Sequence, residues 1–128
     1  MPIYTRAGDR GSTRIYGTRD RLPKTDSRFG ALGAIDELAS QLGLVSSQVS
    51  DRGAKNRILG IQRDLFEIGS ELATGPGQKP PFKLSKVNIT RLERFIDEYW
   101  GQLPPLANFI FPGGTVAASQ AHVARAVC

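Results

Sequence analysis

The 128-residue chain has few of the residues that build covalent or metal-based frameworks, with one cysteine and one histidine. A single cysteine excludes an internal disulfide framework, and these two side chains are too few for a Cys/His zinc site. No apolar run approaches the length of a membrane span, and no signal sequence precedes the first motif. We therefore expect one soluble, cytoplasmic domain with a real core and no membrane partner.

Positive charge is unevenly distributed along the chain. In total, 17 lysines and arginines stand against 12 acidic residues, which gives a net charge of +5. The segment from Arg6 to Arg28 holds seven of the basic side chains and three acids, Asp9, Asp20 and Asp26. A local basic cluster of this kind is typical of a site for a phosphate-bearing ligand, large or small.

The basic cluster begins with residues 4–13, of sequence YTRAGDRGST. This segment has no helical or strand period, so we expect an irregular loop ahead of any strand. Its glycines allow sharp turns, its backbone amides can face an anion, and its hydroxyls and arginines suit a polyphosphate. It is not a Walker A loop, because no strand precedes it and no Gly-Lys-Ser/Thr ends it. A disordered basic tail has a similar composition, so the residues alone leave both interpretations open.

The middle of the chain has the apolar spacing of α-helices. Apolar residues recur at steps of three and four in two stretches, 29–45 and 58–72, which predict two amphipathic helices. A polar stretch separates them, and Thr74-Gly75-Pro76-Gly77 ends the second. No alternating strand pattern competes.

Two further helices complete the predicted architecture. Ser85 is placed to cap one, and Thr115 is placed to cap an alanine-rich one over 116–128. In the first of these, the side chains that we expect to point inward are Ile89, Leu92, Ile96 and Tyr99. The fold class is therefore all-α, a helical bundle with short connections and an N-terminal glycine-rich loop.

Charged side chains lie beside the apolar faces of two of these helices. Asp36 and Glu37 flank the first apolar stripe, and His122 and Arg125 share one face of the alanine-rich helix. Small residues allow another helix to approach closely, and an arginine buried there needs a carboxylate partner. A solvated face needs none, and the residues alone leave the two possibilities open.

Four short motifs occur in order along the chain. They are YTRAGDRGST at 4–13, Lys24-x-Asp26-x-Arg28, GAIDELASQLG at 33–43, and FIFPGG at 109–114 with HVARAVC at 122–128. Together they resemble the PduO-type ATP:cob(I)alamin adenosyltransferases, also called corrinoid adenosyltransferases. The resemblance spans the whole chain, and it favours an ordered N-terminal loop over a tail.

The resemblance implies a fold and a reaction. Family members are homotrimers of five-helix bundles with active sites at subunit interfaces. An N-terminal loop orders over ATP and Mg²⁺, and cob(I)alamin attacks the 5′ carbon of ATP, which gives adenosylcobalamin and triphosphate. We expect one domain over residues 1–128, with an ATP-binding loop at 1–24 and the helical bundle at 25–128. The last helix of the family bundle is not within this sequence.

The resemblance also implies the ATP-binding residues. They are Thr5, Arg6, Ala7, Gly8, Thr13, Arg14 and Lys24. Backbone amides, hydroxyls and positive charges of this kind neutralise a departing triphosphate. Mg²⁺ is usually held by phosphate oxygens and water, so no protein metal ligands are expected.

At the corrin end the resemblance implies three further roles. Phe109 matches the aromatic residue that displaces the lower axial ligand of cobalamin, and Phe111 is the weaker match. Without the resemblance, we would interpret Phe109 as an aromatic residue of the core. Asp36 is implied to pair with Arg125 across the subunit interface, beside the corrin. We leave Glu37, His122 and Cys128 with structural roles.

The chain also departs from the family pattern. Relatives continue past the position of Cys128 with a second ATP-contacting arginine and the final helix, so this is either part of a longer chain or a shortened one. Gly30 stands where relatives commonly have glutamate.

The sequence leaves two alternative functions open. One is a corrinoid carrier without catalysis, and the other is a basic nucleic-acid-binding module. The second is disfavoured because the later helices carry no basic stripe and no aromatic stacking platform. For the enzyme, we expect a cob(II)alamin reductase and an adenosylcobalamin-dependent enzyme as partners, and no nucleic acid.

Overall fold

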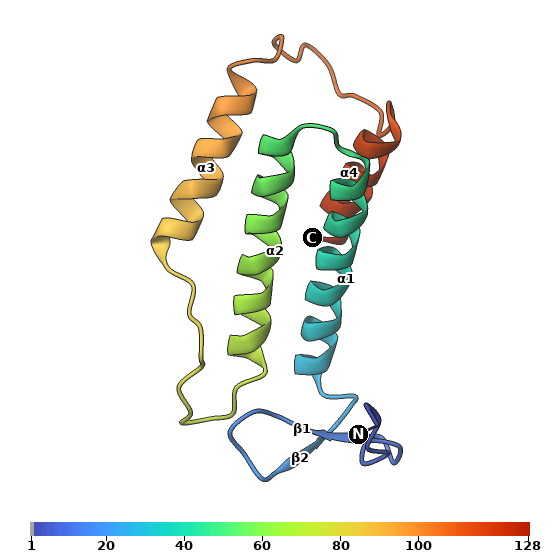
Figure 1. The fold of residues 1–128 in the computed structure, drawn as a ribbon, viewed down its shortest axis with the longest axis vertical. Helices are drawn as coiled ribbons and strands as arrows, with labels where there is room; N and C mark the ends of the chain where they lie inside the picture. Colours follow the sequence, from blue (N-terminus) through green and yellow to red (C-terminus); the bar gives the residue numbers. More distant parts are fainter. Residues whose placement is uncertain (1) are drawn as a thin grey trace.

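The computed structural model describes residues 2–128 as a bundle of α-helices with a small hairpin at one end (Figure 1). The elements are β1 Ser12–Arg14, β2 Arg21–Pro23, α1 Ser27–Gln48, α2 Arg52–Leu72, α3 Lys86–Trp100 and α4 Val116–Val127. Helices α1 and α2 run antiparallel side by side, α4 packs on α1, and α3 stands beside α2. The prediction of an all-α bundle is confirmed. No helix in the described range is long and apolar enough to cross a membrane.

Side-chain caps explain where the helices begin. Asp26 Oδ1 accepts a hydrogen bond from the Arg28 amide at 2.9 Å, at the start of α1. Thr115 Oγ1 accepts from an amide in the first turn of α4 at 3.2 Å. Ser85 precedes α3, and its amide donates to Asn88 Oδ1 at 3.1 Å in a capping box. The predicted caps at Ser85 and Thr115 are therefore confirmed.

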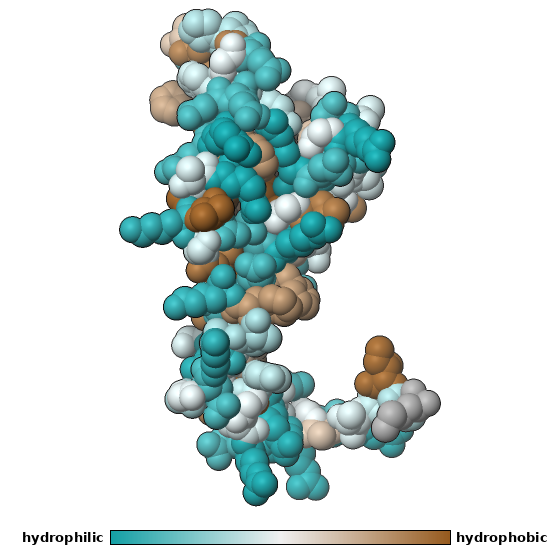
Figure 2. All heavy atoms as spheres, turned by 60° about the vertical axis from the view of Figure 1, so that its left-hand side comes forward, coloured by the Kyte–Doolittle hydropathy of each residue, from teal (hydrophilic) through white to brown (hydrophobic). Residues whose placement is uncertain are grey.

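The core of the described chain is thin. Its buried apolar side chains are Ile15, Val45, Leu65 and Ala124. The accessible surface is 10018 Å², whereas a compact monomer of this mass exposes about 6,700 Å². Figure 2 shows apolar side chains breaking through the polar surface at several heights of the bundle. Much apolar surface thus stays in contact with solvent when the chain is alone.

The expected inward face of α3 is wrong. Ile89, Ile96 and Tyr99 are 60%, 64% and 43% exposed, and Leu92 is half-buried. Two ion pairs link α3 to α2, one between Arg57 and Glu98 and one between Asp64 and Arg91. Helical spacing correctly identified an apolar face, but it does not say whether another element covers that face.

The expected irregular loop ahead of any strand is also wrong in part. β1 pairs antiparallel with β2, with Thr13 opposite Leu22. Strands of three residues are too short to carry an alternating pattern, so their pairing depends on a partner several residues away. Residues 12–23 are therefore a hairpin, and not a disordered tail.

Candidate functional site

The N-terminal loop turns twice before it enters β1. Asp9 donates its amide hydrogen to the Arg6 carbonyl at 3.3 Å, and Gly11 donates to the Gly8 carbonyl at 3.1 Å. Arg6 has φ 55°, the left-handed conformation that few non-glycine residues adopt. Such backbone strain costs of order 1–3 kcal/mol and concentrates at ligand sites. The backbone conformation of Arg6 is therefore a feature that this turn shares with many binding loops.

The hairpin brings distant members of the predicted ATP site together. Thr13 lies on β1, and Lys24 directly follows β2, with its amide donating to the Gly11 carbonyl at 2.8 Å. The Lys24 side chain passes over the turn, because a Cβ added at Gly8 would lie 3.3 Å from both Lys24 Cε and Nζ. An ammonium group and turn amides thus meet at one place, which suits a polyphosphate.

The remaining predicted ATP residues belong to the same end of the molecule. They are Thr5, Arg6 and Ala7 in the exposed loop, and Arg14 at the end of β1. Thr5 Oγ1 accepts a hydrogen bond from the Ala7 amide at 3.4 Å. Within residues 2–128, no cluster of three or more histidine, cysteine or acidic side chains is arranged to hold a metal ion. The predicted ATP residues here offer cationic side chains and backbone amides, which are groups that suit an anion.

A second candidate region lies between α4 and the connection that precedes it. Phe109 and Pro112 from the preceding loop, with His122 and Arg125 from α4, line an open pocket of about 720 Å³. Phe109 is 105% exposed, so its side chain is fully open to solvent in the single chain. The alternative of a plain core aromatic is therefore wrong for this chain. His122, left with a structural role, shares this pocket.

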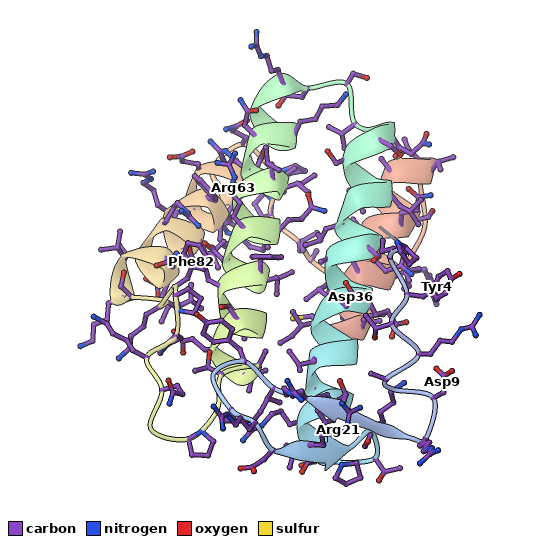
Figure 3. The ribbon with its side chains drawn as sticks, turned by 60° about the horizontal axis from the view of Figure 1, so that its bottom comes forward. Tyr4, Asp9, Arg21, Asp36, Arg63 and Phe82 are labelled. Atoms are coloured by element: carbon purple, nitrogen blue, oxygen red, sulfur yellow. The ribbon has the colours of Figure 1, made fainter. Side chains whose placement is uncertain are left out.

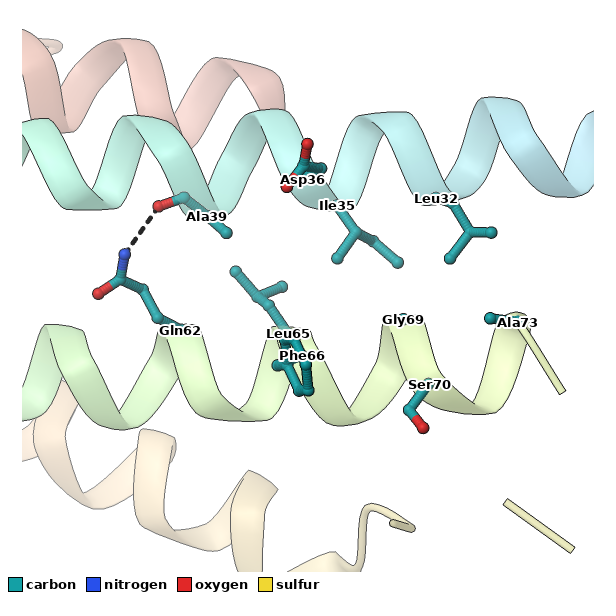
Figure 4. A pocket seen from close by; sticks show the side chains of 10 residues that line it. All are labelled: Leu32, Ile35, Asp36, Ala39, Gln62, Leu65, Phe66, Gly69, Ser70 and Ala73. Carbon is teal, nitrogen blue, oxygen red and sulfur yellow. Dashed lines mark hydrogen bonds between the residues drawn. The ribbon is translucent and has the colours of Figure 1, made fainter. Parts of the chain in front are cut away.

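Asp36 and Arg125 do not meet within one chain. Asp36 is exposed on α1 and lines a groove of about 350 Å³ between α1 and α2 (Figure 4). Its carboxylate points away from Leu65, which fills the groove from the α2 side. Arg125 is exposed on α4 and lines the Phe109 pocket. The ion pairs in the described residues involve neither side chain. Their predicted pairing across a subunit interface remains a prediction.

One hydrogen bond crosses the apolar groove beside Asp36. Gln62 on α2 donates to the Ala39 carbonyl on α1 at 2.9 Å (Figure 4). Its apolar walls come from Leu32, Ile35 and Leu65. The groove holds no convergent set of reactive groups, so it has the character of a packing surface.

Sequence reasoning missed two polar residues with several partners. Asp64 on α2 is buried, accepts from Asn88 Nδ2 at 2.8 Å and forms an ion pair with Arg91. Arg21 on β2 donates three hydrogen bonds to the N-terminal loop and β1. The position of Asp64 inside an apolar stripe was a usable signal, because a carboxylate there needs a partner. Nothing in the sequence distinguishes Arg21 from its basic neighbours.

Comparisons with known proteins point to one family. The sequence model described as cobalamin adenosyltransferase matches residues 3–128. A corrinoid adenosyltransferase of Citrobacter freundii is 38% identical over 125 residues, which cover 96% of this chain and 70% of that protein. The human corrinoid adenosyltransferase MMAB is 38% identical over 133 residues, which cover 98% of this chain and 53% of that protein. The chain therefore spans between about half and about 70% of these two relatives.

A solved structure has the same fold. It is a variant PduO-type ATP:corrinoid adenosyltransferase from Lactobacillus reuteri, complexed with cobalamin and ATP. The TM-score is 0.88 at 38% sequence identity, and the match covers 98% of this chain and 71% of that one. The fold described above is therefore that of a protein whose structure holds both ligands.

Proposed function

Since the chain belongs to the cobalamin adenosyltransferase family, we propose that it transfers the 5′-deoxyadenosyl group of ATP to cob(I)alamin. The products are adenosylcobalamin and triphosphate. The observation that carries the proposal is the nucleotide end of the chain, where the side chain of Lys24 lies against Gly8, in the turn that follows Arg6 with its φ of 55°. Cationic and amide donors there suit the leaving triphosphate.

The transfer is a nucleophilic substitution at carbon. The electron pair on cobalt(I) forms a cobalt–carbon bond to C5′, and the C5′–O bond breaks with its pair going to triphosphate. Cobalt(I) is already a strong nucleophile, so no general base is needed. The protein must align cobalt with C5′ and exclude competing geometries, and alignment of this kind contributes several kcal/mol.

The nucleotide residues have distinct parts in this proposal. The amides of the turn around Gly8 and the hydroxyls of Thr5 and Thr13 bind phosphate oxygens. Lys24, with Arg6 and Arg14, offsets the charge that develops on triphosphate as the bond breaks. Mg²⁺ would be carried on the phosphates that these residues bind, and would offset part of their negative charge.

The corrin residues act on the acceptor. The exposed Phe109 ring displaces the lower axial ligand, which leaves four-coordinate cobalt that is easier to reduce. Arg125, paired with Asp36 of a neighbouring copy, shapes the corrin side of the pocket. The full exposure of Phe109 supports this role, since an aromatic side chain that is open to solvent is available to a ligand.

We extend the proposal to a cytoplasmic homotrimer with active sites between copies. The exposed surface of 10018 Å² supports assembly. The loop that carries Phe109 lies at the opposite end of the ribbon from the hairpin (Figure 1). Reacting atoms must approach to about 3–3.5 Å, so a shared site joins one copy's nucleotide end to another's corrin end. A cob(II)alamin reductase supplies the electron, and an adenosylcobalamin-dependent enzyme receives the product.

An anaerobic assay tests the proposal. Purified protein is mixed with ATP, Mg²⁺ and chemically reduced cobalamin, and the visible spectrum is followed for adenosylcobalamin. Formation of the product with release of triphosphate supports adenosyl transfer. Corrinoid binding without turnover instead supports a carrier, and salt-sensitive binding of nucleic acid without use of ATP supports the basic-module alternative.

A further inference from the structure

The connection between β1 and β2 is hydrogen-bonded to the end of α2. Tyr16 donates its amide hydrogen to the Ala73 carbonyl at 2.8 Å, and the Tyr16 carbonyl accepts from the Gly75 amide at 2.9 Å. These two bonds form a short parallel bridge between Tyr16 and Thr74, and the adjacent Ile15 side chain is buried. Figure 3, which looks onto the hairpin end of the molecule, shows this connection beside the end of α2. The hairpin therefore docks on the helical body through the segment around Tyr16.

Two glycines let the docked segments approach closely. Gly75 is buried, and a Cβ on it would lie 2.1 Å from Thr18 Cγ2 and 3.2 Å from the Tyr16 carbonyl oxygen. From the other side, Gly17 has φ 78°, and a Cβ on it would lie 2.6 Å from Gln78 Cγ. A side chain at either glycine is therefore incompatible with the docked arrangement unless its neighbour moves.

The docked segment limits where the proposed nucleotide residues lie. Thr13 and Arg14 are on β1, three and two residues before Tyr16, so the chain keeps them within about 11 Å of it. Lys24 directly follows β2, which pairs with β1 along its length, so Lys24 moves with the same hairpin. The hairpin is joined covalently to α1 after Lys24 and is held by hydrogen bonds at Tyr16. Opening of the second attachment would carry the nucleotide residues away from the helices.

Resting on the ATP-binding role proposed above, we infer that docking of the Tyr16 segment on the end of α2 is the closed position of the nucleotide-binding hairpin, and that Gly75 is a positioning residue for it. ATP binds to the closed position, in which Thr13, Arg14 and Lys24 surround the phosphates, and binding in turn favours closure. A variant that opens the docking contact lowers the closed fraction, and the apparent affinity for ATP falls by the same factor. With ATP bound the hairpin is closed, so the transfer step keeps its rate.

The test compares Gly75→Ala with the wild-type chain, with Thr18→Ala, and with the double variant that carries both changes. Thr18→Ala removes the Cγ2 atom that the new Cβ would meet, and leaves Thr18 Cβ 3.5 Å away, an ordinary contact. Gly60→Ala, on α2, is the matched control, because a Cβ there would meet no atom of another described element within 4 Å. KM and kcat are measured by adenosylcobalamin formation from chemically reduced cobalamin. Hydrogen exchange of the Tyr16 amide, measured by NMR with and without ATP, reports on the docking bond itself.

Gly75→Ala is expected to raise the KM for ATP about tenfold, the size of a typical overpacking effect. The kcat at saturating ATP and the KM for cobalamin stay as in wild type, and the double variant regains most of the lost affinity because the clash is removed. ATP slows exchange of the Tyr16 amide in the wild-type chain. At the same ATP concentration, this amide exchanges faster in Gly75→Ala.

A wild-type KM for ATP in Gly75→Ala, or exchange of the Tyr16 amide that ATP does not change, overturns the inference. A double variant as impaired as Gly75→Ala also overturns it, because the contact with Thr18 is then not the cause. If Gly75→Ala does not fold, Gly17→Ala tests the same docking from the hairpin side, with the same expected rise in the KM for ATP. Failure of the wild-type chain to bind ATP overturns the proposed function instead.

Discussion

The two candidate regions differ in how much of a site one chain completes. At the hairpin, the turn, Lys24 and Arg21 are joined by hydrogen bonds within the chain. Before α4, Phe109 is 105% exposed and Arg125 takes part in none of the described ion pairs. The nucleotide half is therefore held together by contacts within one chain, whereas the corrin half, as proposed above, is completed by a second copy.

Arg125→Ala gives the largest expected effect. The variant loses the proposed contact to Asp36 of a neighbouring copy, so the kcat/KM for cobalamin falls about a hundredfold, as for truncation of a buried charge pair. ATP affinity is retained, because the hairpin is untouched. Steady-state kinetics with varied cobalamin measure the first effect, and calorimetry with ATP measures the nucleotide affinity. Arg94→Ala, an exposed arginine on α3, is the control. Normal turnover of Arg125→Ala rules out the pairing.

Phe109→Ala sharpens the role of the corrin half. The ring is proposed to ease reduction of cob(II)alamin, so turnover coupled to a reductase falls about thirtyfold, or about 2 kcal/mol of barrier. Turnover with chemically reduced cob(I)alamin falls less, because the reduction step is bypassed. Phe111→Ala is the matched aromatic control, at 96% exposure in the same loop. Equal losses with both cobalamin states would show that Phe109 serves binding alone.

Lys24→Ala probes the nucleotide half. Loss of the ammonium over the Gly8 turn weakens ATP binding, and the KM for ATP rises about tenfold. The KM for cobalamin stays constant, because no corrin contact is removed. Lys79→Ala, in the α2–α3 connection, serves as a lysine control. A rise in the KM for cobalamin alone would place Lys24 in the wrong half of the site.

Asp64→Asn contrasts a charge pair inside one chain with the pair proposed between copies. Asp64 is buried and bound by Asn88 and Arg91, so the free energy of unfolding falls by about 2 kcal/mol. Among the variants proposed here, Asp64→Asn changes the activity at low temperature the least. Denaturant titration measures the free energy of unfolding. Glu98→Gln is the control, because Glu98 lies in an exposed ion pair and its loss lowers that free energy by less than about 1 kcal/mol. Unchanged stability of Asp64→Asn would mean that α3 is held by other contacts.

The helices were predictable from the sequence because their signals are local. Apolar spacing and the caps at Ser85 and Thr115 each act within one or two turns. The hairpin was not predictable, because Ser12 pairs with Pro23 across an irregular connection. The exposure of Ile96 on α3 was not predictable either, since spacing shows that a helix has an apolar face but not what covers it.

The candidate site divides in the same way. Motif resemblance identified Lys24 and the Gly8 turn, and the structure brings them together. Arg21 escaped prediction because its importance comes from hydrogen bonds to carbonyls nine and fourteen residues away, which leave no sequence pattern. The pairing of Asp36 with Arg125 stays a prediction, since one chain does not contain it.

Subunit complementation tests the shared corrin half most directly. Asp36→Ala and Arg125→Ala chains are each purified alone, and are also co-expressed with different tags and isolated as mixed assemblies. If Asp36 of one copy meets Arg125 of another, mixed assemblies contain some intact pairs, and adenosylcobalamin formation rises well above that of either variant alone. Mixed assemblies no more active than either variant alone would contradict a site shared between copies.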